Sequence, residues 1–374
     1  MLDIHIGRRL RELREREHLN QAAMAEVLAL KAPQSVSQIE NGQRRVTTEE
    51  LMRVMKQFDV SLDWLTNPFR LSNRDSFSWR QRQVDPEILR EFEAKTGEWI
   101  GAYRELSRLN ETPLRALLPR LGLTYTSDWQ DAASAGEQVA EELNLGDRPA
   151  HRLAEVLQDS LGILILMVDA PEGVSGAACR LQALNAILVN RHDPEARRNS
   201  DIAHEFFHLL TWDVMKPEHV ESSFEAWEDR PVLRADKRNQ SIERLADNFG
   251  AGLLMPKGAL DLIGEPDRDH LVQWMTDAAA LLGVSSRTLK WRLVNTGRLQ
   301  RDEAPDNEDL AILARARPAC TPPTLFSKPF MNVISTAVEA GHLSGNRAAS
   351  LLGMNKGAIG DLCDVYGVKR PVEL

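Results

Sequence analysis

Hydrophobic residues in the first part of the chain recur at intervals of three and four positions, the spacing of amphipathic helices. Leu10 and Leu13 lie on one face of a first helix in this pattern. Pro33 suits the first turn of a third helix, and Gly42 suits its end. Two further short helices follow, so the pattern predicts one domain of five short helices over residues 1–68.

The pattern changes after this first domain. Residues 69–129 are expected to comprise a polar linker, 69–86, and then a helical stretch. Two apolar runs rich in β-branched residues, 162–168 and 185–190, predict short strands, and helical periodicity surrounds them. We therefore expect a small α+β domain over residues 130–304.

The last part of the chain is helical again. Charged and then Pro-rich sequence after about residue 300 marks a boundary, and a helical region is expected over 305–374. Residues 277–299 and 347–367 each predict a helix, a tight Gly-containing turn and a second helix, for which helical packing or dimer contacts are the expected role. The fold class expected for the chain is mainly α with one small α+β domain that contains a short β-sheet.

Charge and composition narrow the class of protein. The formal net charge of −9 over 374 residues argues against nonspecific coating of nucleic acid, because that binding requires Lys and Arg to neutralise phosphates. No apolar run approaches the roughly 20 residues of a membrane-crossing helix, and the N-terminus lacks the hydrophobic core of a signal peptide. The three cysteines form no CxxC pair, so we expect a cytoplasmic protein without membrane association.

Within residues 1–68, three motifs point to DNA binding: "LNQAAMAEVL", "VSQIENG" and "DVSLDWL". They resemble the helix-turn-helix domain of lambda-type phage repressors and the wider XRE family of regulators. That resemblance implies a third helix in the major groove of operator DNA and a homodimer that reads two half-sites. The alternative is a helix-turn-helix domain used only for protein contacts.

The same resemblance assigns individual residues in the first domain. Gln34, Ser35 and Gln38 would face base edges, and Gln side chains can bond adenine with two hydrogen bonds. Arg14 and Glu40 fall where the family often has a structural ion pair between the first and third helices. The residues expected at the DNA backbone are Gln21, Asn41, Gln43 and Arg44.

The stretch "NSDIAHEFFHLLTW", residues 199–212, carries two histidines four positions apart. On a helix, His204 and His208 share one face and can present their imidazoles to one ion, while Glu205 lies beside them as a candidate base. A catalytic zinc site needs a third protein ligand. A second helix over 241–256 offers Glu243 as that ligand and Asp247 as a hydrogen-bond acceptor for a ligand histidine. The alternative is a buried helix that carries two imidazoles and no metal.

Four segments in this order resemble the ImmA/IrrE metallopeptidases: "AILVN", "DIAHEFFHLL", "IERLADNFGAGLLMP" and "DAAALLGVSSRTLKWRL". The resemblance implies a zincin-like peptidase domain of the gluzincin type that binds Zn²⁺ through His204, His208 and Glu243, with Glu205 as the catalytic base. Members of that family are bacterial and phage regulators that cleave a helix-turn-helix repressor to switch genes on under stress.

Together these features predict a DNA-binding transcription regulator with a fused zinc endopeptidase domain. Its substrate would be a partner regulator or an antitoxin-like protein encoded nearby, in a stress, defence or toxin-antitoxin switch. A second hypothesis is an antitoxin or autorepressor that binds a toxin partner and operator DNA and uses the metal domain for sensing, with little proteolysis. A third is self-cleavage within residues 69–86, which would release the DNA-binding domain.

Overall fold

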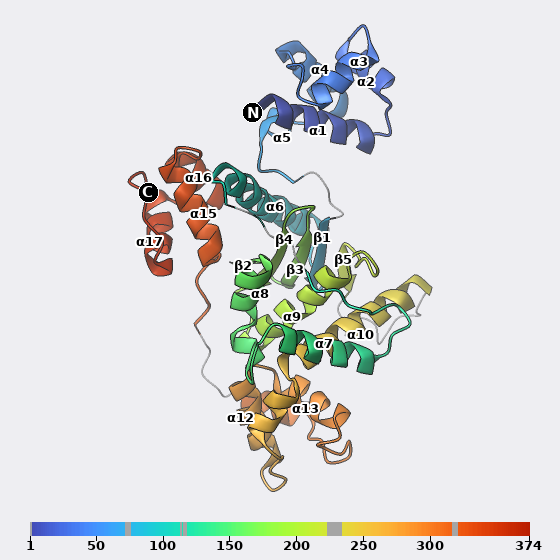
Figure 1. Cartoon of the computed structure of the whole chain (residues 1–374), viewed down its shortest axis with the longest axis vertical. Coiled ribbons are helices and arrows are strands. Elements are labelled where there is room, and N and C mark those ends of the chain that lie inside the picture. Colours follow the sequence, from blue (N-terminus) through green and yellow to red (C-terminus); the bar gives the residue numbers. More distant parts are fainter. Residues whose placement is uncertain (1, 72–75, 113, 115–117, 223–233, 316–320) are drawn as a thin grey trace. The chain divides into compact units, whose positions relative to one another are not determined.

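The chain forms two compact units in a computed structural model (Figure 1). The first unit comprises Met1–Arg74 and Glu93–Leu106, and the second comprises Asp75–Phe92 and Ser107–Leu374. The structure describes residues 2–71, 76–112, 114, 118–222, 234–315 and 321–374.

The predicted five short helices of the N-terminal domain are confirmed. Their bounds are α1 Leu2–Arg16, α2 Gln21–Leu28, α3 Pro33–Glu40, α4 Thr48–Phe58 and α5 Leu62–Thr66. Leu10 and Leu13 lie in the core with apolar residues of α2 and α3. Helix α4 begins with a capping box between Thr47 and Glu50, which satisfies backbone donors at its first turn. A Cβ on Gly7 would lie 2.0 Å from the carbonyl oxygen of Ile39, so α1 and α3 cross at backbone contact.

A mixed β-sheet forms the centre of the second unit. Within the described residues it has five strands in the order β2-β4-β3-β1-β5. The pairs β2·β4 and β1·β5 are parallel, while β3 pairs antiparallel with both β4 and β1. The bounds are β1 Phe77–Gln81, β2 Leu164–Val168, β3 Val174–Arg180, β4 Asn185–Asn190 and β5 Val220–Ser222.

Strand β1 corrects the predicted linker over residues 69–86. Residues 77–81 pair with both β3 and β5 and lie inside the sheet, whereas residues 72–75 lie outside the described part of the chain. The side chain of Trp79 is fully buried, and its ring stacks on that of Phe77 with centroids 5.4 Å apart. The sequence did not predict this strand because five residues are too few to show a recognisable alternation of apolar and polar positions. Its partner strands also lie far along the chain, at residues 174–180 and 220–222.

Four helices of the second unit pack on the sheet or on one another: α7 Trp129–Glu142, α8 Leu153–Leu161, α9 Glu195–Thr211 and α10 Arg234–Leu254. Helix α9 contacts β3 and β4 of the sheet and also contacts α10, which in turn packs against α7 (Figure 1). The contact between α7 and α10 is close at two glycines. A Cβ on Gly136 would lie 2.2 Å from the carbonyl oxygen of Phe249, and a Cβ on Gly252 would lie 2.0 Å from that of Ala133.

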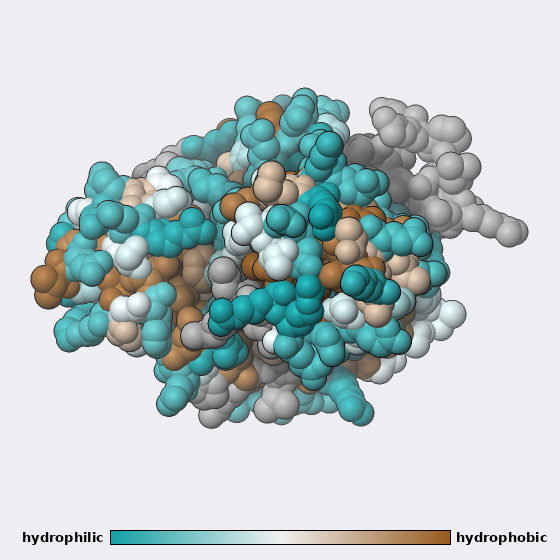
Figure 2. All heavy atoms as spheres, turned by 90° about the horizontal axis from the view of Figure 1, so that it is seen from above, coloured by the Kyte–Doolittle hydropathy of each residue, from teal (hydrophilic) through white to brown (hydrophobic). Residues whose placement is uncertain are grey.

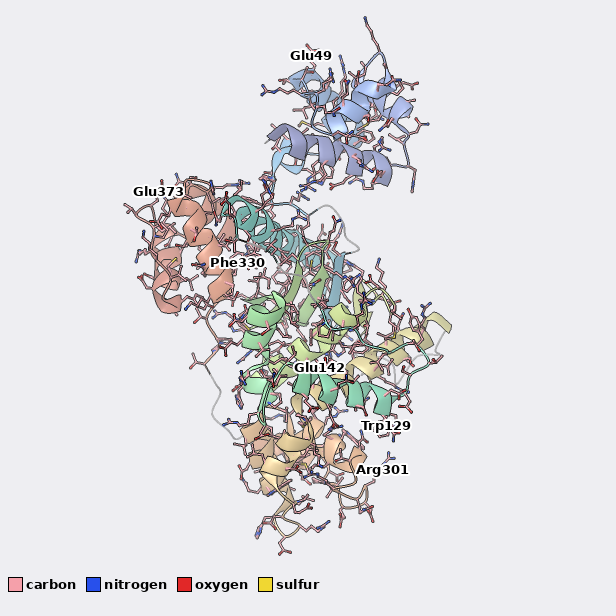
Figure 3. The ribbon with its side chains drawn as sticks, in the orientation of Figure 1. Glu49, Trp129, Glu142, Arg301, Phe330 and Glu373 are labelled. Atoms are coloured by element: carbon pink, nitrogen blue, oxygen red, sulfur yellow. The ribbon has the colours of Figure 1, made fainter. Side chains whose placement is uncertain are left out.

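The expected C-terminal helical region is present, with α14 Asn307–Arg315, α15 Lys328–Glu339, α16 Gly345–Leu352 and α17 Lys356–Tyr366. Phe330 of α15, labelled in Figure 3, is fully buried, and its ring centroid lies 4.9 Å from that of Phe326. The remaining helices of the unit are α6 Pro86–Leu109, which also runs into the first unit, α11 Lys257–Ile263, α12 Leu271–Leu282 and α13 Ser286–Asn295.

Helices α12 and α13 form the expected helix, glycine turn and helix, with Gly283 at a φ of 68°. Two cations of α13, Lys290 and Arg292, face the protein interior, whereas Arg287 is exposed. Lys290 and Arg292 are both 5% exposed, and Arg292 donates to the carbonyl oxygen of Met255 and to Glu137. These contacts support the predicted packing role for α13.

Hydrophilic residues cover most of the face shown in Figure 2, and hydrophobic residues lie between them in separate groups. No helix in the described part of the chain is both long enough and apolar enough to cross a membrane.

Candidate metal centre

Helix α9 carries both histidines of the sequence motif into the interior of the second unit. His204 is 2% exposed, and His208 and Glu205 are fully buried. Helix α10 packs against α9 beside these residues. A Cβ on Gly250 of α10 would lie 3.4 Å from the Cβ of Ala203, which is an ordinary contact distance. The two helices thus approach closely beside the imidazole rings.

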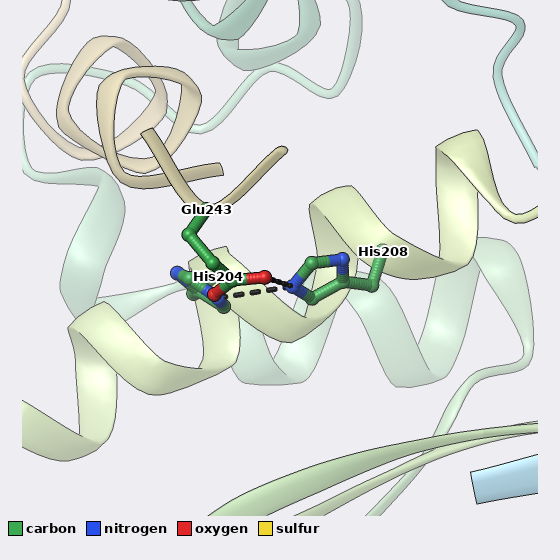
Figure 4. A group of neighbouring side chains, drawn as sticks. All are labelled: His204, His208 and Glu243. Carbon is green, nitrogen blue, oxygen red and sulfur yellow. Dashed lines mark hydrogen bonds and ion pairs between the residues drawn. The ribbon is translucent and has the colours of Figure 1, made fainter. Parts of the chain in front are cut away.

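The structure brings His204, His208 and Glu243 together (Figure 4). The Nε2 atoms of the two histidines lie 3.0 Å apart. The Glu243 carboxylate reaches both, with Oε2 at 3.1 Å from His204 Nε2 and Oε1 at 3.6 Å from His208 Nε2. One ligand atom from each residue lies within 4.8 Å of the others.

These distances and donor types suit a zinc ion. In a tetrahedral site with bonds of about 2.0–2.2 Å, neighbouring ligand atoms lie roughly 3.3–3.6 Å apart. The three separations of 3.0, 3.1 and 3.6 Å are close to that range. Two imidazole nitrogens and one carboxylate also form one of the ligand sets found in catalytic zinc sites. The cluster therefore fits a metal by both geometry and chemistry.

A second group of polar residues holds His204 from its other side. Its Nδ1 lies 2.9 Å from Oδ1 of Asp247, the contact expected of an acceptor for a ligand histidine. Arg80 of β1 lies 3.5 Å from Asp247 and 3.5 Å from Asp201. Burial raises the pKa of Asp201, and the charges of Arg80 and Arg197 act in the opposite direction.

Arg80 and Asp201 were not among the site residues predicted from the sequence. Asp201 carried a usable signal, because it lies three positions before His204 and seven before His208, on the same helical face. Arg80 carried none, because it lies more than a hundred positions before the histidines, in a segment predicted to be a linker.

His192, His219 and Tyr125 carry groups that could donate to an oxyanion, and all three have other contacts in the structure. His192 pairs with Asp169 at 2.7 Å, and Nδ1 of His219 lies 3.3 Å from the carbonyl oxygen of Phe77. The Arg238 guanidinium lies 3.7 Å from the ring centroid of Tyr125. None of these contacts involves a residue of the metal centre.

In the N-terminal domain, the residues expected to face bases lie on α3. Gln34 and Gln38 are exposed and Ser35 is half-buried. Asn41 and Gln43 are exposed at the end of that helix, where contact with a DNA backbone was expected.

The expected ion pair is present in the structure, with Arg14 Nε 2.6 Å from Glu40 Oε1. Two residues assigned to the DNA backbone instead contact carboxylates of the protein. Gln21 donates to Glu40 at 3.2 Å, and Arg44 donates to Glu50 at 2.7 Å. A phosphate contact by either side chain would have to compete with these bonds.

Two exposed cations flank α3 and were not among the predicted DNA contacts. Lys31 precedes the helix, and Arg45 lies in the loop after it. Their positions beside the exposed glutamines suit phosphate contacts on either side of a reading helix. The pair "RR" at residues 44 and 45 was the available signal in the sequence.

The fold and the site define a class of protein: a helix-turn-helix DNA-binding regulator with a domain of metallopeptidase type. The helix-turn-helix family model matches residues 10–65, and the model of the IrrE N-terminal-like domain, a peptidase of type M78, matches residues 158–294. The chain is therefore an XRE-type helix-turn-helix domain fused to a domain of the ImmA/IrrE family. The chain matches no curated protein and no solved structure.

Proposed function

We propose that this chain is a transcription regulator whose ImmA/IrrE-like domain is a zinc endopeptidase that cleaves a partner regulator or an antitoxin-like protein. The observation that carries the proposal is the convergence of two imidazole nitrogens and one carboxylate within 4.8 Å. Such a cut would change gene expression in a stress, defence or toxin-antitoxin switch, since the same chain carries a DNA-binding domain.

In this proposal His204, His208 and Glu243 hold the zinc ion and Asp247 orients the ring of His204. A zinc ion held there would polarise a peptide carbonyl and lower the pKa of a bound water molecule to about 7. Glu205 follows the first ligand directly and is fully buried, so its carboxylate would accept the proton of the attacking water in a region with little bulk water.

The DNA-binding half of the proposal rests on the exposed polar face of α3. Gln34 and Gln38 project from it one helical turn apart and can each bond an adenine edge. Two copies of the chain would read two half-sites of an operator. A footprint on the promoter of its own gene tests this half. Loss of the footprint when both glutamines are changed to alanine supports direct reading, and an unchanged footprint contradicts it.

The peptidase half is tested by co-expression with the products of adjacent genes. Glu205→Gln is the informative variant, because it retains the metal ligands and the shape of the side chain but removes the proton acceptor. We expect a cleavage fragment with the wild type and none with the variant, and we expect a chelator to abolish the cut until zinc is restored. If wild type and variant produce the same fragments and the same cellular phenotype, the endopeptidase function is wrong.

The burial of the site favours one other candidate function. His204, His208 and Glu205 are at most 2% exposed, so a peptide reaches them only if the covering segments move. A metal held there could instead control DNA or toxin binding with little proteolysis. In that case zinc would change operator affinity to the same degree in the wild type and in Glu205→Gln, and no fragment would form.

Self-cleavage in residues 69–86 is disfavoured where strand β1 lies. Residues 77–81 pair with β3 and residues 79–81 pair with β5 as well, whereas a protease must bind its substrate strand in an extended, accessible form. A cut within residues 77–81 is therefore not expected, and a full-length mass that persists during incubation with zinc would exclude a cut in the rest of 69–86 as well.

A further inference from the structure

We propose that Arg80 is a positioning residue of the metal centre and that it acts through Asp247. The inference rests on the zinc site of the proposed function. Its second part is that metal binding and the docking of β1 in the sheet stabilise each other, because Arg80 belongs to that strand.

Arg80 joins the two helices that supply the ligands. One guanidinium nitrogen, Nη1, lies 3.5 Å from Asp201 on α9, and the other, Nη2, lies 3.5 Å from Oδ1 of Asp247 on α10. The same Oδ1 lies 2.9 Å from Nδ1 of His204. A continuous chain of contacts therefore leads from the strand to a metal ligand, and the planar fork of arginine suits two carboxylates at once.

The position of Asp247 explains why it benefits from a cation. Its side chain is 49% exposed, so water competes for its oxygens and leaves the side chain several rotamers. Arg80, at 28% exposure, restricts that freedom through its contact with Oδ1. An acceptor held at Nδ1 fixes the orientation of the His204 ring, so that Nε2 stays directed at Glu243 and His208.

Strand β1 holds Arg80 in place. Trp79, the preceding residue, is fully buried, and its backbone N–H donates to the carbonyl oxygen of His219 at 2.9 Å. Arg80 itself is paired in register with Gly176 of β3. The backbone of Arg80 is thus set by the sheet, while its side chain is set by the two acids. Metal binding should therefore protect β1, and loosening β1 should weaken metal binding.

The experiment measures zinc affinity of the full-length protein by competition with a chromophoric chelator. We expect Arg80→Ala to weaken zinc binding about tenfold, the lower end of the range for residues that support a metal ligand. Arg80→Lys keeps a positive charge near the buried Asp201, so it should fold, but a point charge cannot hold both acids and binding should still weaken. Circular dichroism verifies that both variants are folded.

Arg180→Ala is the matched control. Arg180 lies on the neighbouring strand β3 and is 27% exposed, but it pairs with one aspartate, Asp213, at 2.6 Å, where Arg80 contacts two. We expect its loss to leave zinc affinity within about twofold of the wild type, since exposed pairs contribute little. If Arg80→Ala and Arg80→Lys match Arg180→Ala, the positioning role is wrong while the zinc site itself stands.

A double-mutant cycle separates positioning from general destabilisation. In the Asp247→Ala background, Arg80→Ala should cause no further loss of affinity, because its effect passes through the missing carboxylate. Equal losses in both backgrounds would overturn that route. Hydrogen exchange of peptides covering β1 should slow when zinc is added to the wild type but not to Arg80→Ala. If the wild type binds no zinc, or binds it as well as His204→Ala does, the proposed metal centre fails and the inference fails with it.

Discussion

Gly252 offers the sharpest test of the packing that supports the metal centre. Its substitution by alanine would place a Cβ 2.0 Å from the carbonyl oxygen of Ala133, 2.8 Å from the carbonyl carbon and 3.0 Å from the Cα. A carbon atom keeps roughly 3.5 Å from a non-bonded neighbour, so α7 and α10 would have to separate by about 1.5 Å at this point. The obstructing atoms are backbone atoms of a helix, which cannot move aside as a flexible side chain does.

The expected cost follows from two opposing effects. Overpacking of this kind costs up to about 3 kcal/mol, while replacing a helical glycine with alanine stabilises the helix by about 1 kcal/mol. The free energy of unfolding of the second unit should therefore fall by about 2 kcal/mol in Gly252→Ala. Gly250→Ala is the matched control, two residues earlier in α10, where the new Cβ would lie 3.4 Å from that of Ala203. It should stabilise by up to about 1 kcal/mol through helix propensity alone.

The assay is urea unfolding of the full chain, followed by hydrogen exchange in peptides from α9 and α10 so that the second unit is observed alone. We expect the two variants to differ by about 3 kcal/mol, which is the overpacking cost alone, because the gain in helix propensity is common to both. If both substitutions shift the midpoint equally, the close approach of α7 and α10 at Gly252 is not present in solution and the reasoning is refuted.

Three further predictions concern the site and the DNA-binding domain. His208→Ala should reduce zinc affinity by more than about a hundredfold, because a direct ligand matters more than a supporting residue; isothermal titration measures it, and near-normal affinity would contradict the ligand assignment. Arg45→Ala should weaken operator and nonspecific DNA alike and reduce the salt slope of binding by about one, which gel shifts at several salt concentrations measure; a change in sequence preference instead would indicate a base contact. Burial opposes the ionisation of Glu50, but hydrogen bonds from Arg44 and Thr47 outweigh it and hold the pKa below the ordinary 4.5. The stability that this charge contributes is therefore fully present above about pH 4.5 and lost as the pH falls through the lower folded-state pKa, so acid unfolding of Glu50→Gln should lack this part of the pH dependence.

Much of the helical structure was predictable because its signals are local. The periodicity of apolar residues and the cap at Thr47 act within one or two helical turns, and the five N-terminal helices follow from them. The pair of histidines is equally local, since a separation of four positions places both rings on one face of α9 whatever surrounds it. Glu243 was identifiable because a catalytic site needs a third ligand and its own helix has a recognisable apolar stripe.

The sheet and the residues that support the metal ligands could not be predicted from local sequence signals. The sequence predicted two strands, whereas five are present in the described residues, because strand pairing joins segments as distant as residues 79 and 220. Arg80 belongs to one of those unpredicted strands, so its contact with Asp247 could not be foreseen. The contact between Gly252 and Ala133 depends on how closely two helix backbones approach, and the residue types in the two helices do not determine that distance.

The sequence by itself therefore determined which helices form, which face of α9 can bind a metal and which two domains are joined in the chain. These properties depend on residues within a few positions of one another. Only the tertiary structure decided that Glu243 reaches both histidines, that β1 pairs within the sheet, and that Arg80 contacts Asp247, the hydrogen-bond acceptor of His204. Those outcomes depend on the paths of distant segments, which are set by the packing of the whole domain and not by local propensity.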